Sequence, residues 1–173
     1  MKLKEKQKKV LIQVLNFLAI FISVYLILMS LTLLIVPLTL IEGYHAIASN
    51  EILKMAGIEG KIVFTEPVQI LIGEQTNQQT ILISFLCSGL IELIVLISCI
   101  SATFNADLKK KLKGIALALV AWLILNPIRI ALTILIALNA SVEIAEIVHG
   151  ILFKLSLFII IIGIYFVWMK YVK

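Results

Sequence analysis

Four long apolar runs limit what this chain can fold into. They cover residues 10–36, 81–104, 114–138 and 150–168. A helix needs roughly 20 apolar residues to cross a bilayer core of about 30 Å, so each run is long enough. Hydrophobic residues make up 62% of the chain, which is typical of an integral membrane protein. We therefore expect an all-α membrane protein, a single membrane domain over residues 1–173 with about four transmembrane helices.

Lysine residues set the expected orientation, because cytoplasmic loops carry more Lys and Arg than exterior loops. With four crossings, the N-terminus, the loop after the second run and the C-terminal tail share one side, and all three contain lysines. The opposite loops are mostly acidic. We expect a multi-pass protein of the cell membrane with both termini in the cytoplasm and the first run retained as an anchor. Nucleic-acid binding would need a basic face with aromatic platforms, and the sequence shows no such face.

The loop at residues 41–80 is the largest part expected outside the membrane. Residues 42–56 have apolar side chains at helical spacing, which favours a helix lying on the membrane surface. Residues 61–72 alternate around a proline and suggest a small β-hairpin near the outer face. Residues 141–148 are expected to form another short surface helix. The hairpin would roof a site at this side of the membrane.

Three polar residues lie at matching depths in three of the runs. In the expected orientation, Cys87 lies roughly 9 Å and Arg129 roughly 13 Å below the exterior surface, and His149 lies at that surface. An arginine in a spanning helix costs a few kcal/mol and normally faces a partner or a wet cavity. A lone cysteine is usually packing, and a lone boundary histidine is usually a cap. Their shared depth indicates a site just beneath the exterior surface.

The third run has a polar stretch around Arg129. Pro127 removes a helix hydrogen bond and frees the carbonyl of Leu123, so we expect a kinked, locally polar segment that includes Asn126. Glu92 lies near the depth of Asn126 and Arg129 and is expected to pair with Arg129. Such a pair can be purely structural, since it neutralises two charges in an apolar environment.

Cys87 is followed by two small residues, Ser88 and Gly89, which let another chain approach the sulfur. The two cysteines and two histidines are scattered along the sequence, and His45 stands in the outer loop without companions. We therefore expect no metal site and no cofactor.

This pattern resembles the exosortases of bacteria and the archaeosortases of archaea. The resemblance rests on three motifs in the family's order and covers residues from about 62 to 153: Cys-Ser-Gly-Leu at 87–90, Asn-Pro-Ile-Arg at 126–129 and His-Gly at 149–150. Two features depart from the family. Many members have an acidic residue one or two positions before the cysteine, where this chain has Phe85 and Leu86, and larger members have more spanning segments.

The resemblance implies a membrane-embedded cysteine transpeptidase that removes a C-terminal sorting signal from secreted proteins. The signal consists of a short motif, an apolar helix and a basic tail. Cys87 would be the nucleophile, and His149 would take the thiol proton and return it to the leaving amine. Arg129, helped by Asn126, would stabilise the thiolate or the oxyanion. The implied partners are the secreted substrates and an acceptor such as an amine or a lipid head group.

Two non-catalytic hypotheses also fit the residues. A membrane subunit could bind a small ligand through Arg129, Glu92 and His149, with Cys87 as packing. A structural or assembly subunit would need only a buried Arg-Glu pair. Only the enzyme hypothesis requires the sulfur of Cys87 to be nucleophilic and reachable from the outer side.

Overall fold

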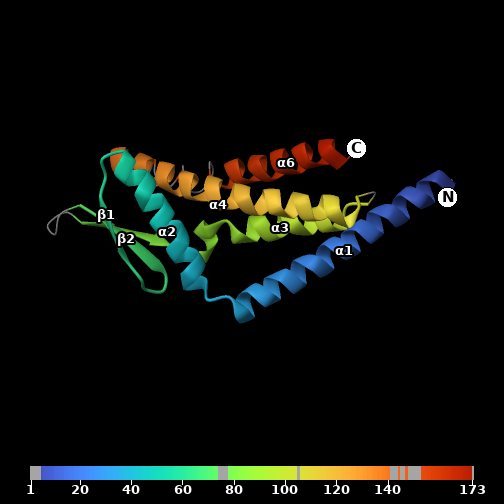
Figure 1. Ribbon diagram of the computed structural model, residues 1–173, viewed down its shortest axis with the longest axis horizontal. Helices are drawn as coiled ribbons and strands as arrows, with labels where there is room; N and C mark the ends of the chain where they lie inside the picture. Colours follow the sequence, from blue (N-terminus) through green and yellow to red (C-terminus); the bar gives the residue numbers. More distant parts are fainter. Residues whose placement is uncertain are drawn as a thin grey trace.

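The computed structural model describes residues 5–73, 78–104, 106–140, 144, 147 and 153–172. In these ranges the chain is mostly helical and contains one small sheet. The sheet and α2 lie at one end of the molecule, and both chain termini lie at the other (Figure 1). The elements in chain order are α1 (Glu5–Ile35), α2 (Leu38–Met55), β1 (Gly60–Val63), β2 (Val68–Ile72), β3 (Gln79–Ile83), the 3₁₀ helix η1 (Phe85–Ser88), α3 (Leu90–Ala102), α4 (Leu108–Asn139) and α6 (Phe153–Val172).

Two of the described helices are long and apolar enough to cross a membrane. They are α1, over Gln7–Ile35, and α4, over Leu108–Asn139. The most apolar stretch of α1 has no fully buried residue, although Tyr25, Leu28 and Met29 on one side of the helix pack against the cluster around α3. A helix that is apolar all round needs an apolar environment. The apolar stretches of α3 and of α6 are shorter, at Leu90–Ala102 and Ile159–Lys170.

The predicted helix at residues 81–104 is wrong in its first third. Residues Gln79–Ile83 form β3, which pairs antiparallel with β2 from Val68↔Ile83 to Ile72↔Gln79. Threonine and isoleucine favour a strand, and the paired register buries Ile83 against the sheet's core. Length and hydropathy alone cannot separate such a strand from the start of a helix.

A helix and a hairpin are both present where the sequence predicts them, with two corrections; the location of the helix on a membrane surface stays a prediction. The helix spans Leu38–Met55 and so begins before the predicted start at residue 42. β1 and β2 form the expected hairpin, but β3 extends it into a three-stranded antiparallel sheet of order β1-β2-β3. The predicted helix at 141–148 is described only at Ile144 and Ile147, both helical, and otherwise lies outside the described residues.

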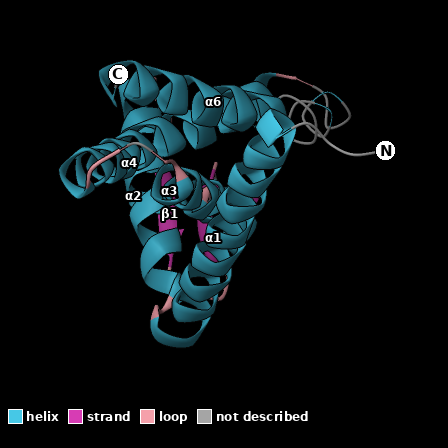
Figure 2. Ribbon diagram, turned by 90° about the vertical axis from the view of Figure 1, so that its right-hand side faces the viewer, coloured by secondary structure: helices cyan, strands magenta, loops and turns pink. Residues whose placement is uncertain are grey.

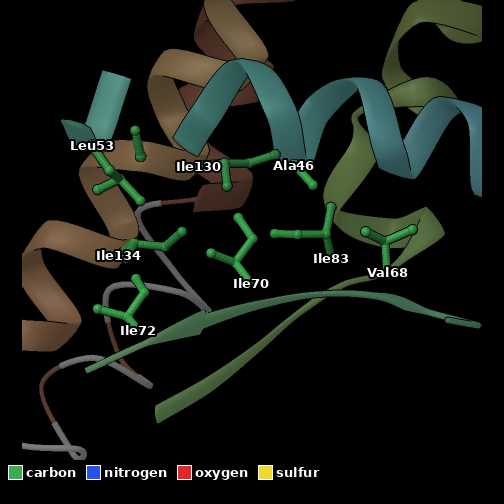
Figure 3. Packing of buried hydrophobic residues seen from close by; sticks show 9 residues of the cluster. Ala46, Leu53, Val68, Ile70, Ile72, Ile83, Ile130 and Ile134 are labelled. Carbon is green, nitrogen blue, oxygen red and sulfur yellow. The ribbon is translucent and has the colours of Figure 1, made fainter. Parts of the chain in front are cut away.

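One hydrophobic cluster fastens α2 and the sheet to the end of α4. Its side chains point toward one another from all three layers (Figure 3). They are Ala46 and Leu53 of α2, Val68, Ile70, Ile72 and Ile83 of the sheet, and Ile130, Ala131 and Ile134 of α4. Because α2 packs against α4 rather than projecting into solvent, its buried polar residues are brought next to the polar stretch of α4.

A second cluster is built around α3. This helix lies between α1 and α4 when the molecule is viewed from the end that carries the termini (Figure 2). Leu93, Leu96 and Ile100 are buried there with Ala118 and Trp168. The indole N–H of Trp168 donates to the carbonyl oxygen of Lys110 at 2.9 Å, which ties α6 to the start of α4. The arrangement sets the start of α3 beside the second half of α4.

Candidate functional site

Cys87 lies on a tight turn between β3 and α3. Ser84 is extended, and its carbonyl oxygen accepts the N–H of Cys87 at 2.8 Å and that of Ser88 at 3.2 Å. The Ser88 hydroxyl donates to the carbonyl oxygen of Phe85 at 2.6 Å and accepts the N–H of Leu90 at 3.3 Å. The Ser84 hydroxyl lies 3.5 Å from the Cys87 sulfur. The turn leaves this sulfur half-buried at the start of α3.

Gly89 ends the turn in a conformation that favours glycine. Its φ is +65°, in the left-handed region. A Cβ atom there would lie 2.8 Å from Oδ1 of Asn126 and 3.4 Å from Nε1 of Trp122. Gly89, which was predicted to let another chain approach the sulfur, is therefore needed to let α4 pack against the Cys87 turn.

Three side chains of α4 satisfy the backbone carbonyls that this turn leaves exposed. Trp122 Nε1 donates to the Ser88 carbonyl oxygen at 2.7 Å, and Asn126 Nδ2 donates to the same oxygen at 2.8 Å. Asn126 Nδ2 also lies 3.2 Å from the Cys87 carbonyl oxygen, which accepts an Arg129 N–H at 2.9 Å. Residues spaced by three or four share a face of a helix, so this spacing presents all three donors together.

Arg129 and Asn126 are both buried, with 7% and 3% of their surface exposed. Arg129 lies close enough to interact electrostatically with Cys87 and Glu92. Arg129 donates a hydrogen bond to the carbonyl oxygen of Cys87, so the guanidinium holds the turn and also brings a positive charge near the thiol.

His45 joins this network although the sequence pattern placed it apart. It is fully buried on α2, and its Nδ1 lies 3.3 Å from Asn126 Nδ2. Its ring packs edge-on against Trp122 at 4.8 Å and against Tyr44 at 5.1 Å between centroids. Its Nε2 is buried, and no hydrogen-bond partner for it is found among the residues that the structure describes. Burial, and to a smaller extent the charge of Arg129, lowers the pKa of His45 to about 4, so the ring is neutral at neutral pH.

Pro127 links α2 to this part of α4. Because proline has no N–H, the Leu123 carbonyl loses its partner within the helix, as the sequence predicts. The hydroxyl of Tyr44 donates to that oxygen at 2.9 Å. Ser49 donates to the carbonyl oxygen of Pro127 at 3.2 Å. The segment around Pro127 is therefore where α2 is hydrogen-bonded to α4, and the kink itself stays a prediction.

A cavity of about 40 Å³ adjoins the turn, between α3, α4 and α6. Gly89, Glu92, Asn126 and Arg129 line it together with apolar residues of all three helices. Glu92, on the first turn of α3, acts on Arg129 electrostatically. The expected pairing of these two described residues is therefore an interaction between nearby charges rather than a hydrogen-bonded contact.

The structure brings together six of the seven residues singled out from the sequence: Cys87, Ser88, Gly89, Glu92, Asn126 and Arg129. His149 lies outside the described residues. Trp122 and His45 were missed. Trp122 could have been found from its spacing of four from Asn126, whereas His45 is 81 residues from Asn126 and carries no local signal. In the part of the chain that the structure describes, no three His, Cys, Asp or Glu side chains gather as metal ligands.

The fold and this site define a mostly helical protein with two helices that could cross a membrane and a half-buried cysteine at a hydrogen-bonded turn. Comparison of the chain with protein-family models, with curated proteins and with solved structures finds no match in any of the three.

Proposed function

We propose that this protein is a membrane-embedded cysteine transpeptidase that removes a C-terminal sorting signal from secreted proteins, as its resemblance to exosortases and archaeosortases implies. The observation that carries the proposal is the placement of Cys87. Its half-buried thiol stands on a turn whose backbone is held by Asn126 and Arg129. A reactive thiol needs such partial exposure and a neighbouring cation.

The reaction begins with attack of the Cys87 thiolate on the scissile carbonyl carbon. A C–S bond forms, and negative charge develops on the carbonyl oxygen, which Arg129 is placed to stabilise. The C–N bond then breaks, and the amine leaves with a proton returned by His149. The sorting helix departs, and the secreted protein stays as a thioester on Cys87. Attack by an acceptor amine or by water releases the product and restores the thiol.

Four membrane crossings are part of this proposal. The lysine-bearing start of α1, the start of α4 and the end of α6 lie at the same end of the molecule, opposite the sheet (Figure 1). This arrangement supports a cytoplasmic location for the lysine-rich end, since positive charge is retained there. The Cys87 turn then faces the exterior, where the scissile bond of a spanning sorting helix emerges.

The cavity beside Glu92 and Arg129 supports a second candidate, a non-catalytic membrane subunit that binds a small ligand. Both charged residues line the cavity, and a polar ligand group could contact them there. This candidate gives the sulfur of Cys87 no role. The two hypotheses therefore differ in what a substitution of Cys87 does.

The deciding experiment is intact-mass analysis of a secreted protein that carries a C-terminal sorting helix and is co-expressed with this protein. We expect the helix to be lost with the wild type and retained with Cys87→Ala. Cys99→Ala is the matched control, because Cys99 is the other half-buried cysteine and lies further along α3. It should process the substrate normally.

Removal of the helix by Cys87→Ala, or its retention with every substrate tested on the wild type, would refute the transpeptidase proposal. Ligand binding would then be the better hypothesis.

A further inference from the structure

β3 is an edge strand of the sheet. In the order β1-β2-β3 it pairs with β2 on one side, and no described residue is hydrogen-bonded to its backbone on the other side. The free side of an edge strand presents a row of N–H and C=O groups to which another extended chain can add. Alternate residues of Gln79–Ile83 direct their backbone groups to this side.

The two edges of the sheet differ in how they are protected. Proteins commonly block a free edge with charged side chains, lysine above all, or with proline. β1 carries the exposed Lys61, and the carbonyl oxygen of Gly60 accepts a hydrogen bond from Asn50 Nδ2 at 3.0 Å. β3 has the sequence Gln-Thr-Ile-Leu-Ile, with no charged residue and no proline, and its Leu82 is 52% exposed. The β3 edge is therefore the one suited to pair with another chain.

This strand leads directly to Cys87. Ser84 continues the extended backbone beyond Ile83, and its hydroxyl lies 3.5 Å from the Cys87 sulfur. Neighbouring strands lie about 4.8 Å apart. A chain paired along β3 and Ser84 thus passes within one strand spacing of the residue that contacts the sulfur.

The course of β3 sets the direction of such a chain. After the Cys87 turn, α3 runs toward the end of the molecule that carries the termini (Figure 1). In the proposed orientation, the chain therefore passes from the exterior sheet through the turn into the membrane. A secreted substrate with a C-terminal sorting helix enters the membrane in the same direction, so the residues before its scissile bond would run parallel to β3.

We propose that the extended segment of the secreted substrate just before its scissile bond binds as a fourth strand, parallel to β3; the inference rests on the proposed transpeptidase function. Main-chain hydrogen bonds hold this segment, and the substrate residue opposite Ser84 lies beside Cys87. Thr80 and Leu82 flank the segment on the sheet face that points away from the cluster containing Ile83, because alternate residues of a strand lie on opposite faces.

The test is site-directed disulfide formation between the full-length protein and a secreted protein whose sorting helix the wild type removes. Thr80→Cys or Leu82→Cys is introduced together with Cys87→Ala and Cys99→Ala, which keeps the substrate uncut and leaves a single thiol. The substrate carries one cysteine, moved through the residues before the mapped cut. We expect Leu82→Cys to react best at one position and Thr80→Cys two residues further from the cut, as parallel pairing requires.

Lys61→Cys in the same background is the matched control. Lys61 pairs with Leu71, which pairs with Thr80, so positions 61 and 80 lie at the same level of the sheet but on opposite edges. It should give less than about a tenth of the crosslinked product, since a disulfide needs Cβ atoms within about 4.5 Å.

A second measurement tests the backbone pairing in the wild type. Synthetic sorting peptides in which one amide before the cut is replaced by an ester each lack one N–H. Processing should slow roughly two- to tenfold at every second position, the effect of losing one hydrogen bond, and stay unchanged at the positions between.

The outcomes separate the docking inference from the function. If the wild type removes the helix from no substrate, the transpeptidase function fails and the inference fails with it. If the helix is removed, four results would each overturn the docking inference alone: equal crosslinking by Lys61→Cys, a shift toward the cut in Thr80→Cys, disulfides only between two copies of this protein, or ester effects that do not alternate.

Discussion

Gly89 lies where the Cys87 turn and α4 come into close contact. Its left-handed φ and its contact with Asn126 both depend on the absence of a side chain. We expect Gly89→Ala to destabilise the protein by about 1–2 kcal/mol from the backbone alone, because alanine is strained in this region. The added methyl group also displaces the Asn126 amide, so processing should fall about tenfold or more.

Substrate processing and unfolding in detergent measure these two effects. Gly163→Ala is the control, since Gly163 lies within α6 and a Cβ there meets nothing within 4 Å. It should leave processing unchanged and stabilise the helix by about 0.5–1 kcal/mol. Equal behaviour of the two variants would contradict the role given to Gly89.

His45 should make stability depend on pH. Burial lowers its pKa to about 4, and an unfolded chain has the ordinary value of about 6.5. Between these two pH values the unfolded state binds a proton that the folded state does not, so acidification favours unfolding. The free energy of unfolding should fall by roughly 3 kcal/mol as the pH drops from 6.5 to 4, and this contribution should not change further below 4.

The measurement compares detergent-solubilised wild type and His45→Phe, which keeps an aromatic ring without a titrating group. All other titrating residues are common to both proteins, so the difference between the two pH profiles isolates His45. The wild type should lose more stability on acidification. Parallel profiles would mean that the ring is not held neutral.

The residues of the site could be predicted from sequence where a bilayer makes polarity costly. Cys87, Asn126 and Arg129 stand out because they interrupt apolar runs, and the structure places them in one network. His45 lies on a helix with many polar residues, so nothing distinguishes it until α2 packs against α4. The catalytic roles stay predictions, and that of His149 concerns a residue outside the described ranges.

At the scale of elements, the contact between α2 and α4 is centred on Pro127. The Tyr44 hydroxyl replaces the donor that proline removes from the Leu123 carbonyl. We expect Tyr44→Phe to cost about 1 kcal/mol of stability, the usual net value of a hydrogen bond. In a Pro127→Ala background, the new N–H at position 127 can donate to Leu123 within the helix, so the same change should cost clearly less.

A double-mutant cycle on the free energy of unfolding gives this coupling. Ser49→Ala serves as the control, because its acceptor is the carbonyl of residue 127, which alanine also has. Its cost should be the same in both backgrounds. Equal costs of Tyr44→Phe with and without Pro127 would show that the hydroxyl does not compensate for the proline.

Elements were predicted well where one periodicity dominates. The surface helix and the β1–β2 hairpin follow directly from helical spacing and from alternation. β3 was missed because its apolar residues run straight into those of α3, and its pairing with β2 is a long-range property that no local window contains. Gly89 was predicted to let another chain approach the sulfur of Cys87. In the structure, its left-handed backbone conformation ends the turn before α3.

At the scale of the whole molecule, hydropathy identifies the two long helices but overestimates the second apolar run. That run includes a strand and a 3₁₀ turn, so only 13 of its residues form α3. The resulting arrangement sets the sheet and α2 at the end of the molecule where α3 starts and α4 ends (Figure 1). Total hydrophobicity alone does not predict this arrangement, because it depends on how α2 folds back.

The shortness of α3 also bears on the host lipid. At about 1.5 Å per residue, its 13 residues span about 20 Å, against about 30 Å of hydrocarbon in a typical bilayer. With α3 in the membrane as proposed, the start of this helix lies below the level of the surrounding head groups, and the lipid must thin there or leave a water-filled depression. Under the proposed transpeptidase function, the acyl-chain length of the membrane would then set the depth of the Cys87 turn, and the position of the cut should move along the same sorting signal as the bilayer thickens.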